Sequence, residues 1–311
     1  MNTGAALTIR EAAEADAGAL SAFMRGQGQE RSNAEYLRHW YFHNPTKGGI
    51  VIVGERDGAP VGMATMNAHR FERATETALV AMPQKVLTDA SLRGQGVFGK
   101  LYRASERACF EKGVDFFLTV TNQASTDIFL SKFGYVRLPA PRIAALLPLP
   151  GKIEMSLLTP GDVVTPAVGM NGDAWHMAKD DSHYRWRFMD HPLKEYVSAR
   201  CSTNGKELGS VFLKRVKKKG VPVMLLLDMT PREVATSGDL LRVARKLAWK
   251  HRALALLCLQ EERLLLAITA NSPVMHRSSG FNFLAKGKDE SHTRALAREP
   301  VEISFGDLDF F

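Results

Sequence analysis

The sequence contains little cysteine and no long apolar run. Its three cysteines, Cys109, Cys201 and Cys258, lie far apart and do not form the spacing of a metal site. Few, scattered cysteines exclude a disulfide scaffold and favour a reducing compartment. No stretch of about 18 uncharged apolar residues occurs, so we expect no membrane span.

The first residues contain neither the basic nor the apolar stretch of a signal peptide, so we expect a cytoplasmic protein. Of 311 residues, 45% are hydrophobic and 24% are charged, which argues against disorder and favours a packed soluble protein. The net charge of +8 favours anionic partners such as phosphates, nucleic acid or an acidic protein, without choosing among them.

Strand-like and helix-like patterns alternate along the first half. Residues 50–53 and 61–66 flank Asp57-Gly58, which predicts a hairpin. Residues 96–112 place apolar side chains on one face and charged ones on the other, which predicts a long helix. The sequence therefore predicts an α/β protein with a mixed central sheet.

Prolines crowd residues 139–150, and we place a domain boundary there, between residues 1–150 and 151–311. The second half repeats the first in outline at a spacing of about 146 residues. Trp186 with His191-Pro192 resembles Trp40 with Asn44-Pro45, and Asn204-Gly205 resembles Asp57-Gly58 as a hairpin turn. We interpret this as one fold used twice; a chance match of common hairpin and helix patterns is the alternative.

A glycine-rich loop, Leu-Arg-Gly-Gln-Gly-Val-Phe-Gly-Lys-Leu at residues 92–101, joins a predicted strand to the long helix. Gly94, Gly96 and Gly99 let the backbone turn without Cβ clashes. The helix start offers unpaired N–H groups and a positive dipole end, and Arg93 adds a full charge. The loop therefore predicts a phosphate site; a plain turn with a solvated arginine is the alternative.

Two phosphate motifs fit this loop incompletely. Gly94, Gly96 and Gly99 match the dinucleotide fingerprint, but Asp115 begins the next strand, whereas the fingerprint needs an acidic residue at its end. The same glycines with Lys100 approach a P-loop, but Leu101 replaces the Ser or Thr that holds Mg²⁺. A P-loop or dinucleotide-binding enzyme is therefore an alternative function.

A third pattern, Arg93-x-x-Gly96-x-Phe98, resembles the pyrophosphate loop of the GNAT superfamily of acyl-CoA-dependent N-acyltransferases. The family pattern is Gln/Arg-x-x-Gly-x-Gly/Ala; this chain departs from it at Phe98, and Gly99 follows at once. The predicted order of elements over residues 7–147 also resembles the family. So do Asn122 after the next strand and Gly134-Tyr135 after the next helix. The resemblance covers about the first 150 residues well and the rest in outline.

The resemblance implies two GNAT-like domains in tandem. Residues 1–150 would be the catalytic, acyl-CoA-binding domain, and residues 151–311 a degenerate copy that shapes the acceptor cleft. The implied activity is transfer of an acyl group from acetyl-CoA, or another acyl-CoA, to an amine. The amine would attack directly, without a covalent enzyme intermediate and without a metal.

The resemblance also implies a set of cofactor-binding residues: Val86, Leu87, Thr88, Arg93, Gly94, Gln95, Gly96, Val97, Phe98, Gly99 and Asn122. Asp89 follows the donor-binding strand and is our first choice for the base, and Asn122 is predicted to bind pantetheine or a catalytic water. A loop-starting Asp and a turn-forming Asn are the alternatives.

Other side chains are less suited to catalysis. His39, His43 and His69 are alternative bases, each more typical of surface or packing. Phe129 and Leu130 occupy the region where many GNAT enzymes place a tyrosine acid, and we expect Tyr135 to pack into the sheet. A thiol pKa of ~8.5 lets the thiolate leave without a protein acid. Because that acid is missing, a non-catalytic acyl-CoA-binding or scaffold protein is another alternative.

Residues 214–219 carry five basic side chains in six positions. They predict either a solvated hairpin tip or a docking patch for an acidic carrier protein or anionic substrate. Aromatic residues are not interleaved with these bases, so we do not expect nucleic acid as a partner. A small-molecule amine is the expected acceptor.

Overall fold

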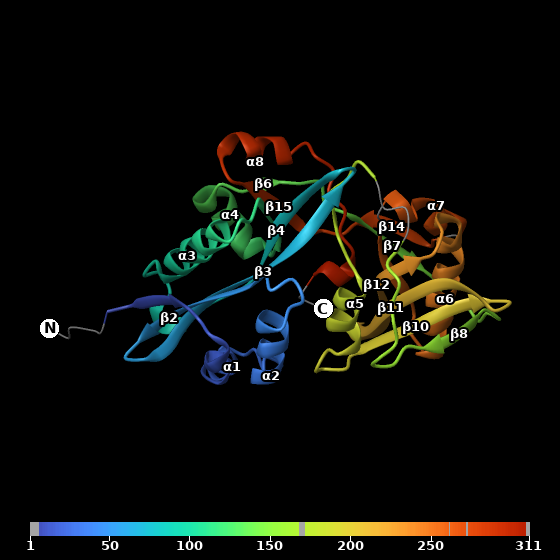
Figure 1. Ribbon diagram of the computed structural model, residues 1–311, viewed down its shortest axis with the longest axis horizontal. Helices are drawn as coiled ribbons and strands as arrows, with labels where there is room; N and C mark the ends of the chain where they lie inside the picture. Colours follow the sequence, from blue (N-terminus) through green and yellow to red (C-terminus); the bar gives the residue numbers. More distant parts are fainter. Residues whose placement is uncertain (1–5, 168–171, 261, 272, 309–311) are drawn as a thin grey trace.

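The computed structural model describes residues 6–167, 172–260, 262–271 and 273–308. These residues form two mixed β-sheets side by side, each with helices packed against it (Figure 1). The predicted mixed α/β class is therefore confirmed. No helix among the described residues is long and apolar enough to span a bilayer. All three cysteines are buried.

The first sheet is built mainly by the N-terminal half. Its order is β1 (Thr8–Glu11), β2 (Gly49–Arg56), β3 (Ala59–Arg73), β4 (Glu76–Thr88), β5 (Phe116–Thr121), β15 (Asn282–Gly287) and β6 (Val136–Arg137), with β9 (His176–Met177) paired to β3. The β4 and β5 strands run parallel, and the other neighbours are antiparallel.

The second sheet is built mainly by the C-terminal half. Its order is β14 (Met275–Ser278), β7 (Arg142–Leu146), β13 (Leu256–Gln260), β12 (Val221–Pro231), β11 (Lys206–Lys218), β10 (Tyr196–Thr203) and β8 (Glu154–Leu157). Here β12 and β13 form the parallel pair.

The two sheets exchange a strand. β7 precedes residue 150 but lies between β14 and β13, and β15 comes from the C-terminal half but lies between β5 and β6. In Figure 1 the red β15 stands in the blue and green half, and the green β7 stands in the orange half. Leu284 of β15 is fully buried in the apolar core between the first sheet and α3, which we call the first core. Each sheet is thus completed by the other half of the chain.

Helices cover the sheets and connect the strands. They are α1 (Ala17–Gly26), α2 (Ala34–Leu37), α3 (Val97–Glu111), α4 (Gln123–Phe133), α5 (Asp181–Tyr184), α6 (Ser237–Lys250), α7 (Glu262–Ala270) and α8 (Glu290–Leu296), with π-helical turns η2 (Arg38–Phe42) and η4 (Arg185–Met189). The predicted helix at residues 96–112 is α3. It buries Val97, Leu101 and Cys109 and ends at Glu111. Gly113 follows two residues later with a φ of 83°, which only glycine adopts readily.

Some elements of the second half follow one another in the same order as in the first half. α2 and α5 each follow an Asx cap, Asn33 or Asp180, and each continues into a π-helical turn and a strand. Trp186 is the second residue of η4 and so matches His39, while Trp40 matches Arg187; the expected match of Trp186 with Trp40 is wrong by one residue. The Trp40 and Trp186 rings instead stack on each other, 4.7 Å apart, where the two halves meet.

Candidate active site

The parallel strands β4 and β5 separate soon after they meet. They pair only at Val80 with Phe116 and at Ala81 with Phe117, although β4 continues to Thr88. β4 also bulges here, because Gln84 and Lys85 stand opposite Thr65 alone, and the Lys85 N–H donates to Thr65 Oγ1 at 3.0 Å. Thr119 Oγ1 of β5 still donates to Pro83 O at 3.4 Å, and beyond it the edge of residues 84–88 that faces β5 is open to a ligand.

The glycine-rich loop starts α3 beside this open edge. Gly94 and Gly96 have φ of 77° and 76°, and a Cβ at either position would meet nothing within 4 Å. Glycine is thus required by backbone conformation rather than by lack of space. Within the described residues, the N–H groups of Gly94, Gly96, Val97 and Phe98 have no backbone acceptor. Together with the helix dipole they make a cradle whose charge suits an anion, and phosphate binding there stays a prediction.

Phe98, the departure from the family pattern, packs away from the cradle. Its ring stacks on Tyr102 with centroids 6.2 Å apart and contacts Phe133 at 6.0 Å. Both partners belong to the core between α3 and α4. The Phe98 side chain therefore packs between α3 and α4. The Phe98 N–H belongs to the first turn of α3 and stays part of the cradle.

Asp89 and Asn122 both cap turns. Asp89 Oδ1 accepts from Ser91 N at 2.9 Å and from Ser91 Oγ at 2.6 Å; these bonds lower the pKa of the exposed Asp89 carboxyl. Asn122 Oδ1 accepts from Ser125 N at 2.9 Å and so begins α4 at the end of β5. The structure brings both residues to the open edge, and their catalytic roles stay predictions.

Tyr135 packs into the core as expected. It is 3% exposed, and its hydroxyl lies 2.5 Å from the hydroxyl of Tyr102. Burial raises the pKa of both phenols well above the usual value. The alternative bases are not gathered at the open edge either. His69 is buried between the halves, His43 pairs with Glu14 at 3.1 Å, and His39 bonds to Trp186 O at 2.8 Å.

A cavity of about 400 Å³ opens next to the β4 bulge. The N-terminal half contributes Lys85 and the segment between α1 and α2, and the C-terminal half contributes the opposite wall. The lining residues are Gly28, Gln29, Glu30, Arg31, Ser32, Tyr36, Trp40, Lys85, Arg187, His191, Leu193, Glu195, Tyr196 and Lys214. We call it the acceptor cavity. Sequence reasoning missed these residues, apart from Lys214, because no local motif joins them.

Cations outnumber carboxylates in the acceptor cavity, four to two. Glu195 is paired with both Arg31, at 2.9 Å, and Lys214, at 2.5 Å. Arg187 is buried and donates to Tyr196 Oη at 2.5 Å and to the carbonyls of Gly306 and Leu308. Its guanidinium also lies 4.8 Å from the centroid of the Trp40 ring. The charge of the cavity is consequently suited to a ligand with an anionic group.

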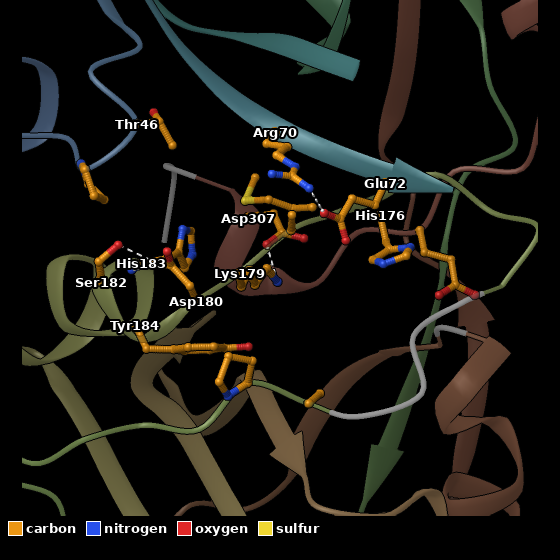
Figure 2. Close-up of a pocket in the computed structure, with 16 residues that line it drawn as sticks. Thr46, Arg70, Glu72, His176, Lys179, Asp180, Ser182, His183, Tyr184 and Asp307 are labelled. Carbon is orange, nitrogen blue, oxygen red and sulfur yellow. Dashed lines mark hydrogen bonds and ion pairs between the residues drawn. The ribbon is translucent and has the colours of Figure 1, made fainter. Parts of the chain in front are cut away.

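A second cavity, of about 390 Å³, lies between β3 and α5 (Figure 2). On its floor Lys179 pairs with Asp228 and Asp307, both at 2.6 Å, and Arg70 pairs with Glu72 at 2.7 Å on its wall. Asp228 follows a bulge in β12 at the position that corresponds to Lys85 in β4. No residue of β4 or of the glycine-rich loop lines this cavity, so it is separate from the open edge.

Two buried histidines lie where the halves meet, and we expect them to make the folded protein less stable in acid. His69 and His183 rings lie 6.0 Å apart, and burial lowers the pKa of His69 to about 4 and that of His183 well below its usual value. Below pH ~6.5 these histidines are protonated in the unfolded chain but stay neutral in the folded chain. The free energy of unfolding therefore falls as the pH falls toward the pKa of the folded state. Each such histidine costs up to about 1.4 kcal/mol per pH unit.

His69→Gln should therefore reduce the slope of unfolding free energy against pH between about 6.5 and 4, measured by denaturant unfolding. His43→Gln is the control, because His43 is an exposed histidine of the same half. A His69→Gln slope equal to that of the wild type would contradict the prediction.

Comparisons with known proteins agree with this geometry. Residues 17–135 match the Acetyltransferase (GNAT) family, and among the described residues no group of His, Cys, Asp or Glu is arranged to hold a metal ion. No curated protein matches the sequence.

Three solved structures share the fold over most of the chain. A GCN5-related N-acetyltransferase from Anabaena variabilis ATCC 29413 has a TM-score of 0.64 and 9% identity, covering 91% of this chain and 73% of that one. A probable N-acyltransferase from Enterococcus faecalis V583 has a TM-score of 0.65 and 9% identity, with 91% and 72% covered. A putative acetyltransferase from Pyrococcus horikoshii has a TM-score of 0.56 and 12% identity, with 99% and 96% covered.

Proposed function

Because the chain carries a domain of the GNAT acetyltransferase family at residues 17–135, we propose that it is an N-acyltransferase that moves an acyl group from acyl-CoA to an amine. Acetyl-CoA is the donor that we favour. The observation that carries the proposal is the open edge of β4 beside a loop in which four N–H groups, those of Gly94, Gly96, Val97 and Phe98, have no backbone acceptor among the described residues.

In this proposal the chain holds the donor at two places. The N–H groups of Gly94, Gly96, Val97 and Phe98 and the Arg93 side chain bind the diphosphate. Gln95 completes the turn, and Gly99 lies in the first turn of α3. Backbone groups of Val86, Leu87 and Thr88 bind the pantetheine arm, and an N–H of the same edge stabilises the oxyanion. Asn122 lies at the end of β5, from which it would bond pantetheine or a water.

The acceptor amine would enter from the acceptor cavity and attack the thioester carbonyl directly. Residues 1–150 then act as the catalytic domain, and residues 151–311 as a degenerate copy that walls the cavity. Two features favour a degenerate copy. The segment between β12 and α6, which corresponds to the glycine-rich loop, has no Arg-x-x-Gly pattern. Asp228 is held in a buried ion triad where the first half has Lys85.

The competing nucleotide functions fit the geometry less well. Leu101, at the P-loop position for a Mg²⁺ ligand, is fully buried in the core. Asp115 bonds to Leu79 N and Lys288 before β5 begins, at the opposite end of that strand from the glycine-rich loop. Arg215, Lys217, Lys218 and Lys219 are exposed at the β11–β12 turn. This basic surface keeps an acidic carrier protein, in place of coenzyme A, as an alternative source of the acyl group.

The experiment that tests the function is a thermal melt with coenzyme A, acetyl-CoA, ATP and NAD, followed by turnover with a panel of amines. Stabilisation by coenzyme A and release of free thiol with at least one amine would support the proposal. Stabilisation by nucleotides alone would favour a P-loop or dinucleotide enzyme. Coenzyme A binding without turnover would favour the non-catalytic alternative.

Asp89→Asn separates catalysis by Asp89 from its role as a cap. Asparagine keeps the oxygen that accepts from Ser91 but cannot take a proton. If Asp89 is the base, we expect kcat to fall more than about tenfold, with a loss that shrinks at high pH as the amine becomes neutral. Unchanged kcat with unchanged stability would leave Asp89 as a cap only.

Tyr135→Phe should lower kcat less than about tenfold, below the usual contribution of general acid catalysis. The Tyr135 hydroxyl bonds to Tyr102 in the core and does not reach the open edge. The main cost should be stability, about 1–3 kcal/mol, because the Tyr102 hydroxyl loses its partner. A hundredfold loss of kcat with intact coenzyme A affinity would contradict this placement of the acid.

A further inference from the structure

A third cavity lies on the C-terminal half, away from the open edge. It has a volume of about 490 Å³ and lies between α6, the end of α7 and the segment at residues 149–153. Its lining residues are Leu149, Pro150, Gly151, Lys152, Ile153, Arg242, Arg245, Lys246, Ala270 and Asn271. We call it the linker cavity. Four of these residues are cations and none is a carboxylate, which distinguishes it from the two cavities described above.

The deepest cation of the linker cavity has only uncharged partners. Arg245 is 9% exposed; its Nε donates to Leu147 O at 2.8 Å and its Nη1 to Asn271 O at 2.9 Å. Lys246 Nζ donates to Ile153 O at 2.8 Å. Across the described residues, no carboxylate lies within ion-pair distance of Arg245, Lys246 or Lys152. Only Arg242, at the mouth, has a carboxylate partner, Asp239 at 2.5 Å.

The linker cavity therefore has positive charge that no carboxylate neutralises among the described residues. Carbonyls satisfy the N–H groups of Arg245, and the negative end of α7 offsets part of its charge, but neither cancels a full unit. Burial and the neighbouring Arg242 lower the pKa of the Arg245 guanidinium, which shows that its charged form is disfavoured where it stands. Arg242, Arg245 and Lys246 also repel one another at helical spacings of three and four residues.

We propose that the linker cavity binds a small organic phosphate, with Arg245 and Lys246 at its base and Arg242 and Lys152 at its mouth. A phosphate group matches several converging cations because its charge and acceptor oxygens are spread over one small group. Leu149, Pro150 and Ile153 give the cavity an apolar wall, which suits an organic substituent better than a bare ion. The site is independent of the acyl-CoA site, because no residue of 86–99 lines it.

The test uses the full chain with Gly96→Glu, which blocks the other proposed phosphate site. Calorimetric titration compares phenyl phosphate with inorganic phosphate. We expect saturable binding of phenyl phosphate, at least about threefold tighter than inorganic phosphate. Lys152→Ala with Arg242→Ala should weaken it about tenfold. Both side chains are exposed, so the pair should leave the melting temperature within a few degrees.

Lys217→Ala with Lys250→Ala is the matched control, since it removes the same charge from exposed positions outside the cavity. The control pair should change phenyl phosphate affinity less than twofold. Absence of saturable binding, or equal losses in the two pairs, would overturn the proposal. If Gly96→Glu does not fold, the wild type saturated with coenzyme A gives the same comparison.

Discussion

Gly96→Glu should abolish coenzyme A binding, with a loss of affinity of at least roughly a hundredfold, about 2.8 kcal/mol. Gly96 has a φ of 76° and begins α3, so a side chain there strains the backbone that aims the N–H groups of the cradle. The glutamate also brings a negative charge to the place proposed for the diphosphate. Calorimetry on the wild type should give one coenzyme A per chain, because the second half has no equivalent loop.

Gly58→Glu is the matched control for this variant. Gly58 has a φ of 74° in the β2–β3 turn, and a Cβ there also meets nothing within 4 Å. The two variants therefore introduce the same strain and the same charge, but only one does so at the cradle. Equal affinities in the two variants, or two equivalent sites in the wild type, would contradict a single donor site at the glycine-rich loop.

Residues 1–150 expressed alone should fail to form a cooperatively folded domain. The fragment lacks β15, which pairs with β5 along its whole length, from Asn282 with Thr121 to Gly287 with Phe116. Without it the edges of β5 and β6 are unpaired, and the first core loses the fully buried Leu284. Burial of each such apolar side chain is worth about 1.5–3 kcal/mol, a large share of the stability of a domain.

The control fragment joins residues 1–150 through a flexible linker to residues 281–297, which carry β15 and α8. It should recover a cooperative melt by circular dichroism and slow amide exchange in β5, at least in part. Part of the core is shared between the halves, so full stability is not expected. A cooperative melt of residues 1–150 alone would show that the exchanged strand is dispensable.

Local features were predicted well because their causes are local. A left-handed turn needs glycine wherever it occurs, and Gly94, Gly96, Gly113 and Gly134 all adopt positive φ. The helical period of residues 97–111 likewise predicts the helix itself and places Val97 and Leu101 on its buried face. The uncertainty about Asp89 and Asn122 also has a local reason, since the residue types that cap a turn are the ones that can act in catalysis.

The sequence by itself determined the mixed α/β class and the left-handed glycine turn that begins α3. Only the tertiary structure decided which sheet each strand joins, because the pattern of β7 or β15 specifies a buried strand but not its neighbours. It also decided the acceptor cavity. There Lys85 lines the same cavity as Glu195 and Lys214 from the other half, and residues so far apart in sequence come together only when both halves pack.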